Sequence, residues 1–211
     1  GNMAGAGSNT RGLFVGGFYN NIDYITIAST GNATDFGDLF DTADNTPGAL
    51  ANATRAVFGK VGVGNGGGTS NLMVYVTIAS TGNSSNFGTL SGGTRKQNLE
   101  GASSSTRGLF AGGYRSYPSI VYYNTIEYIT IASTGATSDF GDLDTGLDGG
   151  AFGSGKTRAV FAGGYNGSTS NNVMQYVTIA TTGNTTDFGD LTVAKTGMGA
   201  ASSVHGGNYS G

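Results

Sequence analysis

The chain of 211 residues contains no cysteine, no tryptophan and a single histidine. Without cysteine it can form no disulfide, carry no thiol nucleophile and hold no iron–sulfur cluster or zinc finger. A single histidine, His205, cannot supply a multi-histidine metal site or a repeated histidine acid–base system. We therefore expect no metal and no cofactor.

Charge and long apolar runs are also scarce. Charged residues make up 11% of the chain, the net charge is −3, and the ten Lys and Arg residues are scattered. A nucleic-acid-binding surface needs a basic patch, so no nucleic-acid partner is expected. No apolar run approaches the ~18 residues of a membrane helix, and residues 1–9 have neither the basic nor the apolar region of a signal peptide. No membrane insertion is expected.

Glycine is abundant, with 40 residues, and much of it lies in an internal repeat. A Thr-Arg motif and a Tyr-(Ile/Val)-Thr-Ile-Ala motif alternate four times, and the Thr-Arg pairs recur at intervals of 44, 52 and 51 residues. So regular a spacing is typical of folded repeats rather than of low-complexity sequence. The first motif occupies residues 10–18, 54–62, 106–114 and 157–165, and the second occupies residues 24–39, 75–90, 128–143 and 176–191.

Each unit predicts four short strands: a small-residue segment such as 3–9, the Thr-Arg segment, the Tyr-centred segment and a short Asp-Phe-Gly segment. β-branched residues dominate these runs, and Gly, Asn and Asp lie between them, as in strands joined by tight turns. In segment 24–29 both alternating faces carry apolar groups, which suits a strand covered on both sides. No window has the apolar period of a helix, so we predict an all-β fold with negligible helix.

Four-stranded units of about 50 residues, covered on both faces, are typical of β-propeller blades. The double glycine that ends the second strand, with an aromatic residue after it, resembles the signature of the kelch repeat; it occurs as Gly16-Gly17-Phe18, Gly112-Gly113-Tyr114 and Gly163-Gly164-Tyr165. The resemblance implies a single domain, a kelch-like propeller of four blades over about 3–48, 49–98, 99–150 and 151–197. The chain departs from the kelch pattern in having no tryptophan and in carrying Lys60-Val61 in the second unit.

The sequence of the second motif is similar to the repeats of Gly-rich proteins of bacteriophages and some bacteria, described as kelch-like virion or tail-associated proteins. This resemblance implies a structural or adhesive subunit of a virion, tail appendage or extracellular filament. Further copies of the chain or other virion proteins would be its partners. It implies no enzymatic activity, and the cysteine and histidines of copper-radical kelch-fold oxidases are missing.

The units differ mainly in their loops, which is where a rigid scaffold commonly carries recognition. The loop at residues 114–124 is rich in side chains that suit glycan or protein contacts, namely Tyr114, Arg115, Tyr117, Tyr122 and Tyr123. A lectin-like module that recognises glycans through this loop is the alternative function. The alternative structural interpretation is that these tyrosines only extend the flanking strands and pack on the next blade.

An arginine recurs at one position in every unit, as Arg11, Arg55, Arg107 and Arg158. Because the position is the same each time, we predict a structural role between blades, with hydrogen bonds to carbonyl groups or to a carboxylate. The candidate carboxylates are the repeated acids Asp35/Asp38, Asp139/Asp142 and Asp187/Asp190. A glycosidase would instead need an asymmetric acid pair, and only the loop acids Asp41, Asp44, Glu100, Asp144 and Asp148 are unrepeated.

Residues 198–203 repeat the small-residue first strand a fifth time, so 198–211 form a partial fifth unit with a surplus strand. This strand could replace the first strand of the chain and close the ring. It could instead pair with the next molecule and link copies head to tail. A piece of a longer repeat array is the third possibility.

Overall fold

The computed structural model of the chain describes residues 3–17, 19–41, 47–61, 70–91 and 96–202. These residues form eighteen strands and no helix, which confirms the all-β prediction. Consequently, the described part of the chain has no helix that could cross a membrane. The strands belong to four antiparallel sheets of four strands each and one two-stranded hairpin.

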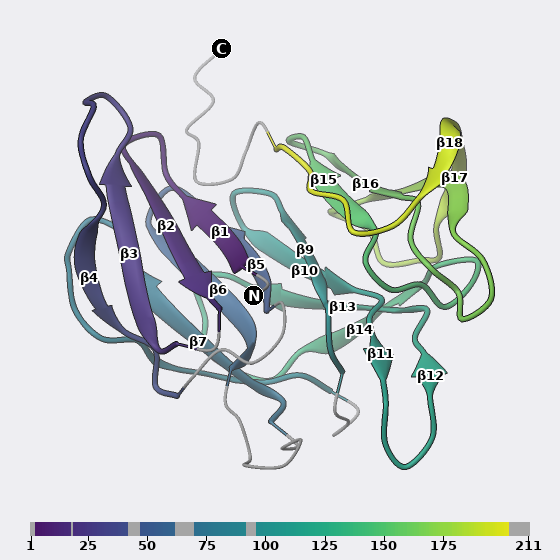
Figure 1. Cartoon of the computed structure of the whole chain (residues 1–211), viewed down its shortest axis with the longest axis horizontal. Coiled ribbons are helices and arrows are strands. Elements are labelled where there is room, and N and C mark those ends of the chain that lie inside the picture. Colours follow the sequence, from purple (N-terminus) through teal and green to yellow (C-terminus); the bar gives the residue numbers. More distant parts are fainter. Residues whose placement is uncertain (1–2, 18, 42–46, 62–69, 92–95, 203–211) are drawn as a thin grey trace.

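Each of the four sheets comes from one repeat unit and has its strands in chain order (Figure 1). The first sheet contains β1 (Met3–Gly7), β2 (Arg11–Gly16), β3 (Asn21–Thr26) and β4 (Thr34–Asp38). The second contains β5 (Gly48–Ala51), β6 (Arg55–Val61), β7 (Leu72–Thr77) and β8 (Ser85–Thr89). The third contains β9 (Glu100–Ser103), β10 (Arg107–Ala111), β13 (Thr125–Thr130) and β14 (Ser138–Asp142). The fourth contains β15 (Ala151–Ser154), β16 (Arg158–Ala162), β17 (Asn171–Thr178) and β18 (Thr186–Lys195).

The third strand of each sheet ends earlier than the sequence pattern predicts. β3 stops at Thr26, and the expected continuation through Ser29 is wrong. The amide of Ser29 donates a hydrogen bond to the carbonyl of Thr26, which turns the chain away from the sheet. The same turn follows Thr77, Thr130 and Thr178. As a result, the Ile-Ala-Ser segment, which is Ile-Ala-Thr in the fourth unit, lies on the loop side of each sheet, where it can meet a neighbouring sheet.

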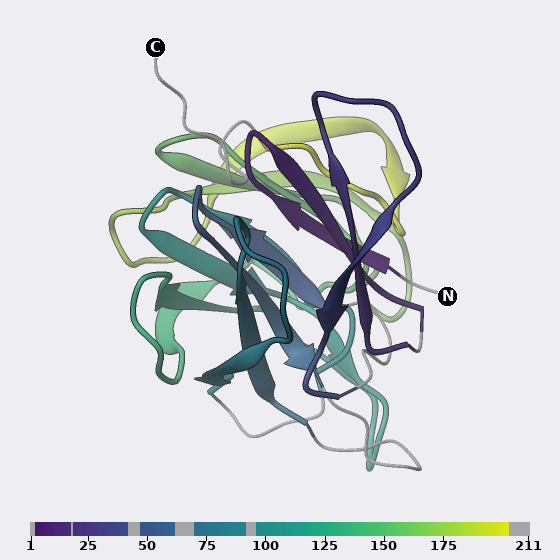
Figure 2. The same ribbon diagram turned by 90° about the vertical axis from the view of Figure 1, so that its left-hand side faces the viewer.

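The four sheets pack in series, because each face that meets another sheet is apolar. One core joins the first sheet to the second, another joins the second to the third, and a third joins the third to the fourth. The small-residue strands β1, β5, β9 and β15 contact one another in that order at the centre of the molecule. Figure 2 shows the sheets fanning out from this centre. Glycine and alanine allow such close approach: a Cβ on Gly101 would lie 2.2 Å from the carbonyl oxygen of Ala49.

Candidate functional site

The same polar contacts join each sheet to the next. An arginine at the start of the second strand donates through Nη1 to the carbonyl oxygen of an isoleucine in the following sheet, at 2.9 Å each time. The pairs are Arg11 with Ile78, Arg55 with Ile131 and Arg107 with Ile179. Each guanidinium also lies over a tyrosine ring of its own sheet, at 4.3 to 4.8 Å from the ring centroid. The partners are therefore main-chain carbonyls, and the repeated aspartates are not used.

Backbone contacts complete this interface. The amide of a glycine after each third strand donates to the carbonyl oxygen of a phenylalanine in the preceding sheet, at 2.7 Å in all three cases. These pairs are Gly82 with Phe36, Gly135 with Phe87, and Gly183 with Phe140. The next residue adds a side-chain contact in two of them, because Asn83 and Asn184 accept hydrogen bonds at 3.0 Å from the amides of Asp38 and Asp142.

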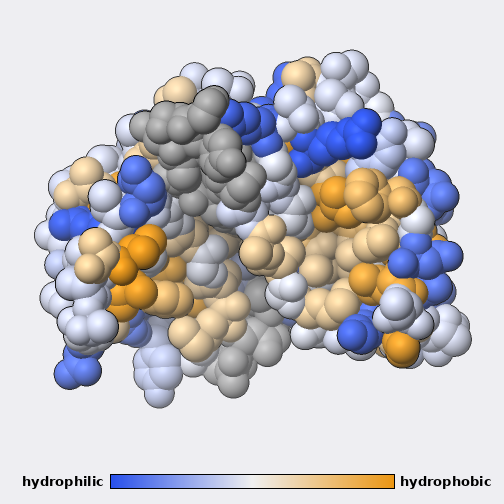
Figure 3. Space-filling view, turned by 90° about the horizontal axis from the view of Figure 1, so that it is seen from above, coloured by the Kyte–Doolittle hydropathy of each residue, from blue (hydrophilic) through white to orange (hydrophobic). Residues whose placement is uncertain are grey.

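The two ends of the series carry one half of this interface each. We call the outer side of the fourth sheet the trailing face; it includes Arg158, Tyr176, Phe188 and Asp190. We call the outer side of the first sheet the leading face; it includes Phe14, Ile27, Gly31 and Asn32. Figure 3 shows hydrophobic surface both on the side that carries β1–β4 and on the side that carries β15–β18.

The apolar side chains of these two end faces are much more exposed to solvent than the equivalent side chains inside the molecule. Phe188 is 50% exposed, whereas its counterparts Phe36, Phe87 and Phe140 are buried. On the leading face, Ile27 is 55% exposed, whereas Ile78, Ile131 and Ile179 are buried. Phe14 is 37% exposed, whereas its counterparts Phe58, Phe110 and Phe161 are buried. The two end faces are thus apolar surfaces of the kind that the fold buries elsewhere.

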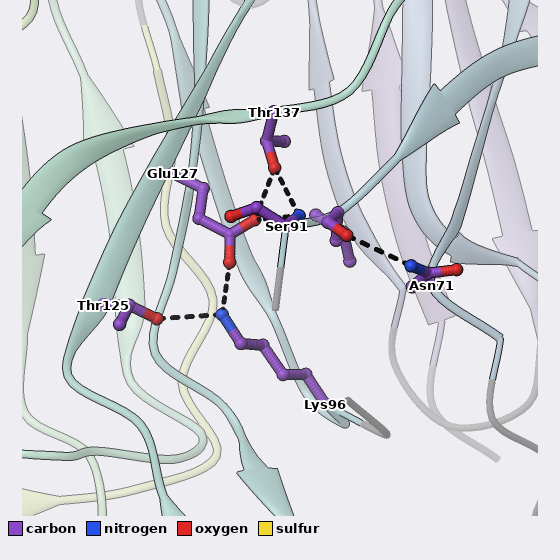
Figure 4. Close-up of polar contacts among 7 residues, drawn as sticks. Asn71, Ser91, Lys96, Thr125, Glu127 and Thr137 are labelled. Atoms are coloured by element: carbon purple, nitrogen blue, oxygen red, sulfur yellow. Dashed lines mark hydrogen bonds and ion pairs between the residues drawn. The ribbon is translucent and has the colours of Figure 1, made fainter. Parts of the chain in front are cut away.

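A buried polar cluster ties the second sheet to the third (Figure 4). The Glu127 carboxylate forms an ion pair with Lys96 and accepts hydrogen bonds from the Ser91 amide and the Thr137 hydroxyl. Lys96 also donates to the hydroxyl of Thr125. In the fourth sheet, Gln175 takes the place of Glu127 and accepts from the amide of Asp144. The sequence analysis missed both residues; a polar side chain just before the repeated tyrosine was the available signal.

The tyrosine-rich loop forms a hairpin of β11 (Tyr114–Arg115) and β12 (Val121–Tyr122), which projects from the third sheet (Figure 1). The rings of Tyr114 and Tyr122 stack at 6.0 Å, and Tyr122 meets Tyr165 of the fourth unit edge to face. Lys96 lies over the ring of Tyr123 at 5.0 Å.

The remaining side chains of this loop lie nearer its tip. The guanidinium of Arg115 donates to Ser119 within the hairpin. Tyr117 is 64% exposed and Ile120 is 66% exposed. The structure therefore divides the five predicted ligand residues: Tyr114, Tyr122 and Tyr123 pack along the hairpin stem, and Arg115 and Tyr117 lie towards the tip.

A central cavity of about 490 Å³ is lined by the small-residue strands of all four sheets and by residues 197–200. Two unrepeated acids come together beside it, Glu100 in β9 and Asp148 before β15. Burial, and secondly the charge of Asp148, raise the pKa of Glu100 to about 8. Burial also raises the pKa of Asp148, although hydrogen bonds from Asn98 and from the Gly149 amide act in the opposite direction. Among the described residues, no group of three or more acidic or histidine side chains is placed to hold a metal ion.

Residues 198–202 continue the central series beyond β15. Ser154 donates through its hydroxyl to the carbonyl of Ser103 in β9, and its own amide donates to the hydroxyl of Ser202 at 2.8 Å. The surplus segment thus lies beside β15 much as β15 lies beside β9. The rest of the partial fifth unit, including His205, lies outside the described residues.

No protein-family model matches this sequence, and a comparison with curated proteins finds no significant similarity.

Proposed function

We propose that the chain is a non-enzymatic structural or adhesive subunit of a larger assembly, with its four sheets as the blades of a kelch-like propeller. A phage virion, a tail appendage or an extracellular filament is the assembly that the resemblance in its repeats implies. The observation that carries the proposal is the pair of uncovered end faces, because the described residues bury three copies of the same interface and leave a fourth unmade.

Uncovered repeat ends carry a specific physical penalty. Repeat proteins that act alone usually end in units with a polar outer face, since the terminal unit lacks a neighbour. Here the terminal faces retain Phe14, Ile27 and Phe188 at positions that are buried in the internal units. Apolar surface of this kind marks an interaction site or leads to aggregation. A subunit that is covered by a neighbour in its assembly avoids both the penalty and the aggregation.

A lectin-like binding module is the second candidate, and the projecting hairpin favours it. Tyr117 presents an amphipathic ring near the hairpin tip, with Arg115 close by in the sequence, and such side chains suit contacts with sugars. In an assembly the same hairpin would be the adhesive element, so the two functions are compatible. The hairpin alone would carry function if the chain acts as a monomer.

Electron microscopy of the native material, combined with light scattering of the purified chain, tests the main proposal. Filaments or a particle-bound array that contain the chain support it. Native material in which the chain is a free monomer contradicts it. For the second candidate, a glycan array probed with the wild type and with Tyr117→Ala is the matched test, and equal binding by the two proteins would exclude Tyr117 as a contact.

A further inference from the structure

We infer that the trailing face of one copy binds the leading face of a second copy, so that copies join head to tail through a fourth instance of the internal interface. This inference rests on the proposed function and names the partner: another molecule of the same chain. It extends an interface that the structure already contains three times. The polar and apolar contacts across it are those of the internal interfaces, and the pairing of the central strands is the part that changes.

The internal interfaces specify which atoms meet. By the equivalence of repeat positions, Arg158 of one copy donates to the carbonyl oxygen of Ile27 in the next, as Arg11 does to Ile78. The amide of Gly31 donates to the carbonyl of Phe188, as Gly82 does to Phe36. The side chain of Asn32 accepts from the amide of Asp190, as Asn83 does from Asp38.

The trailing face is already arranged for this contact. The guanidinium of Arg158 lies 4.4 Å from the centroid of the Tyr176 ring, within the range of the three bonded arginines. Tyr176 and Phe188 make the same edge-to-face pair, at 6.0 Å, that Tyr75 and Phe87 make inside the molecule. The difference from the internal interfaces is that the partner sheet would come from another copy. Binding would therefore need little rearrangement of the trailing face, which lowers the entropy lost on association.

The leading face supplies the complementary features. Gly31 leaves room for a close backbone approach, as its counterparts do: a Cβ at any of the four positions would meet no atom within 4 Å. Its internal counterparts Gly82, Gly135 and Gly183 each donate to the preceding sheet. Covering Ile27 and Phe14 on one side and Phe188 on the other removes their remaining apolar surface from water, which favours association.

The two faces are different surfaces, so the contact is heterologous. Each copy has one of each face, and association repeats until a ring closes or a filament forms. Residues 198–202 lie beside β15, where the first strand of a following sheet belongs. The incoming copy therefore docks with β2, β3 and β4, and residues 198–202 of the first copy take the place of its β1.

Two single substitutions test the inference on the full-length chain. Ile27→Asp places a charge on the leading face and leaves the trailing face intact, and Phe188→Asp does the reverse. Because both side chains are about half exposed in a single copy, both variants should fold as monomers and melt at similar temperatures, below that of the assembled wild type. We expect the wild type to scatter light as oligomers or filaments and each variant to scatter as a 21.2 kDa monomer.

Mixing the two variants gives the decisive result. In an equimolar mixture, the Ile27→Asp copy supplies an intact trailing face and the Phe188→Asp copy supplies an intact leading face. The mixture should therefore form a dimer of twice the monomer mass and no larger species. The matched control mixes Ile27→Asp with Phe14→Asp, which damage the same face, and should stay monomeric. A mixture of Ile27→Asp and Phe188→Asp that remains monomeric would overturn the inference.

Two further outcomes separate the inference from the proposed function. If the wild type assembles and neither substitution lowers its mass, the interface is wrong and the structural function stands. If the purified chain is monomeric at every concentration but native particles contain it, the self-partner is wrong, and the chain joins a different virion or filament protein.

Discussion

Arg55 and Arg158 make the same contact with a tyrosine but differ in what lies beyond it. Arg55 is half-buried and donates to the carbonyl of Ile131, whereas no sheet follows the exposed Arg158 among the described residues. A hydrogen bond from a charged donor contributes about 1.5–3 kcal/mol, and an exposed cation–π contact about 0.5–1 kcal/mol. We expect Arg55→Ala to lower the free energy of unfolding by ~2–3 kcal/mol and Arg158→Ala by less than ~1 kcal/mol.

Denaturant unfolding measures this difference. Both substitutions belong in the Ile27→Asp background, which holds the chain as a monomer and keeps association out of the comparison. Equal losses for the two arginines would show that the stacking on tyrosine, rather than the carbonyl across the interface, is what each guanidinium supplies.

Glu100 makes the stability of the folded chain fall as the pH rises, whereas most surface acids have the opposite effect. Its pKa is raised from an ordinary value of 4.5 to about 8, so between these values the folded state holds a proton that the unfolded state has released. Stability from this group is complete below pH 4.5 and is lost as the pH rises to about 8. We expect Glu100→Gln to flatten the fall in melting temperature between pH 5 and pH 9. Asp148 is unchanged in both proteins, so parallel curves would refute a titrating Glu100.

At the residue scale, the sequence predicted where the repeated side chains lie better than it predicted which groups they bind. Repetition predicted that all four arginines lie between sheets; Arg11, Arg55 and Arg107 do, whereas Arg158 lies exposed on the outer side of the fourth sheet. It also left carbonyl and carboxylate partners open, because hydrogen-bond partners depend on the offset between neighbouring sheets. Glu127 was missed for a related reason. Its equivalents in the other units are Asp23, Val74 and Gln175, so no single residue type marks the position.

Among the elements, the fourth strand of each of the first three sheets comes close to the backbone of the following sheet at a glycine. A Cβ on Gly88 would lie 1.9 Å from the carbonyl oxygen of Gly135, whereas a Cβ on Gly189 in the fourth sheet would meet nothing within 4 Å. Both have positive φ, at 149° and 126°, in a region that glycine adopts far more readily than other residues, so an alanine at either position incurs a backbone strain of about 1–3 kcal/mol. Only Gly88→Ala adds a clash with a neighbouring backbone.

We therefore expect Gly88→Ala to lower the melting temperature far more than Gly189→Ala. Thermal unfolding of the two variants in the monomeric background is the measurement, and the Gly189 variant is the matched control for backbone strain. Equal losses would mean that the sheets shift apart at no measurable cost in stability.

Replacement of β1 by residues 198–202 is an expectation at the scale of a single strand. In the dimer of Ile27→Asp and Phe188→Asp, only the Phe188→Asp copy contributes its leading face. Isotope labelling of that copy allows its amide exchange to be followed separately. We expect its Ala4 and Ala6 amides, which lie opposite Val15 and Leu13 of β2 at the hydrogen-bonded positions of the single chain, to lose protection on dimer formation. Unchanged protection would mean that residues 198–202 move aside and β1 stays.

The sequence located the elements well where side chains set the boundaries and poorly where hydrogen bonds do. β-branched residues marked the centres of β3, β7, β13 and β17, but the turn after each threonine is made by backbone groups that any residue has. The fourth sheet adds another case. β18 extends to Lys195, ten residues in all, because β17 begins early enough for Asn171 to pair with Lys195.

For the whole molecule, repetition predicted four equivalent sheets, since each copy of a motif must meet similar neighbours. It did not predict which copies would lack a neighbour. Phe14 and Phe188 have the same sequence context as their buried counterparts, and only the arrangement of the sheets distinguishes them. Whether the end faces meet within one chain or between chains is therefore a question about the assembled molecule.

Disulfide cross-linking between introduced cysteines answers that question. Because the chain has no cysteine of its own, only the introduced thiols can react. Inside the molecule, the Asn83 side chain lies 3.0 Å from the Asp38 amide, so the equivalent residues Asn32 and Asp190 should be adjacent across the contact between copies. A disulfide requires Cα atoms roughly 4.4–6.8 Å apart, and residues joined by so short a side-chain-to-backbone hydrogen bond are the natural pair to replace. We expect the Asn32→Cys/Asp190→Cys variant to form, on oxidation, a series of covalent multiples of the 21.2 kDa chain that a reductant dissolves. Asn32→Cys alone can reach only a dimer. A product of monomer mass with both thiols consumed would contradict head-to-tail association, because it would mean that the leading and trailing faces of one chain close on each other.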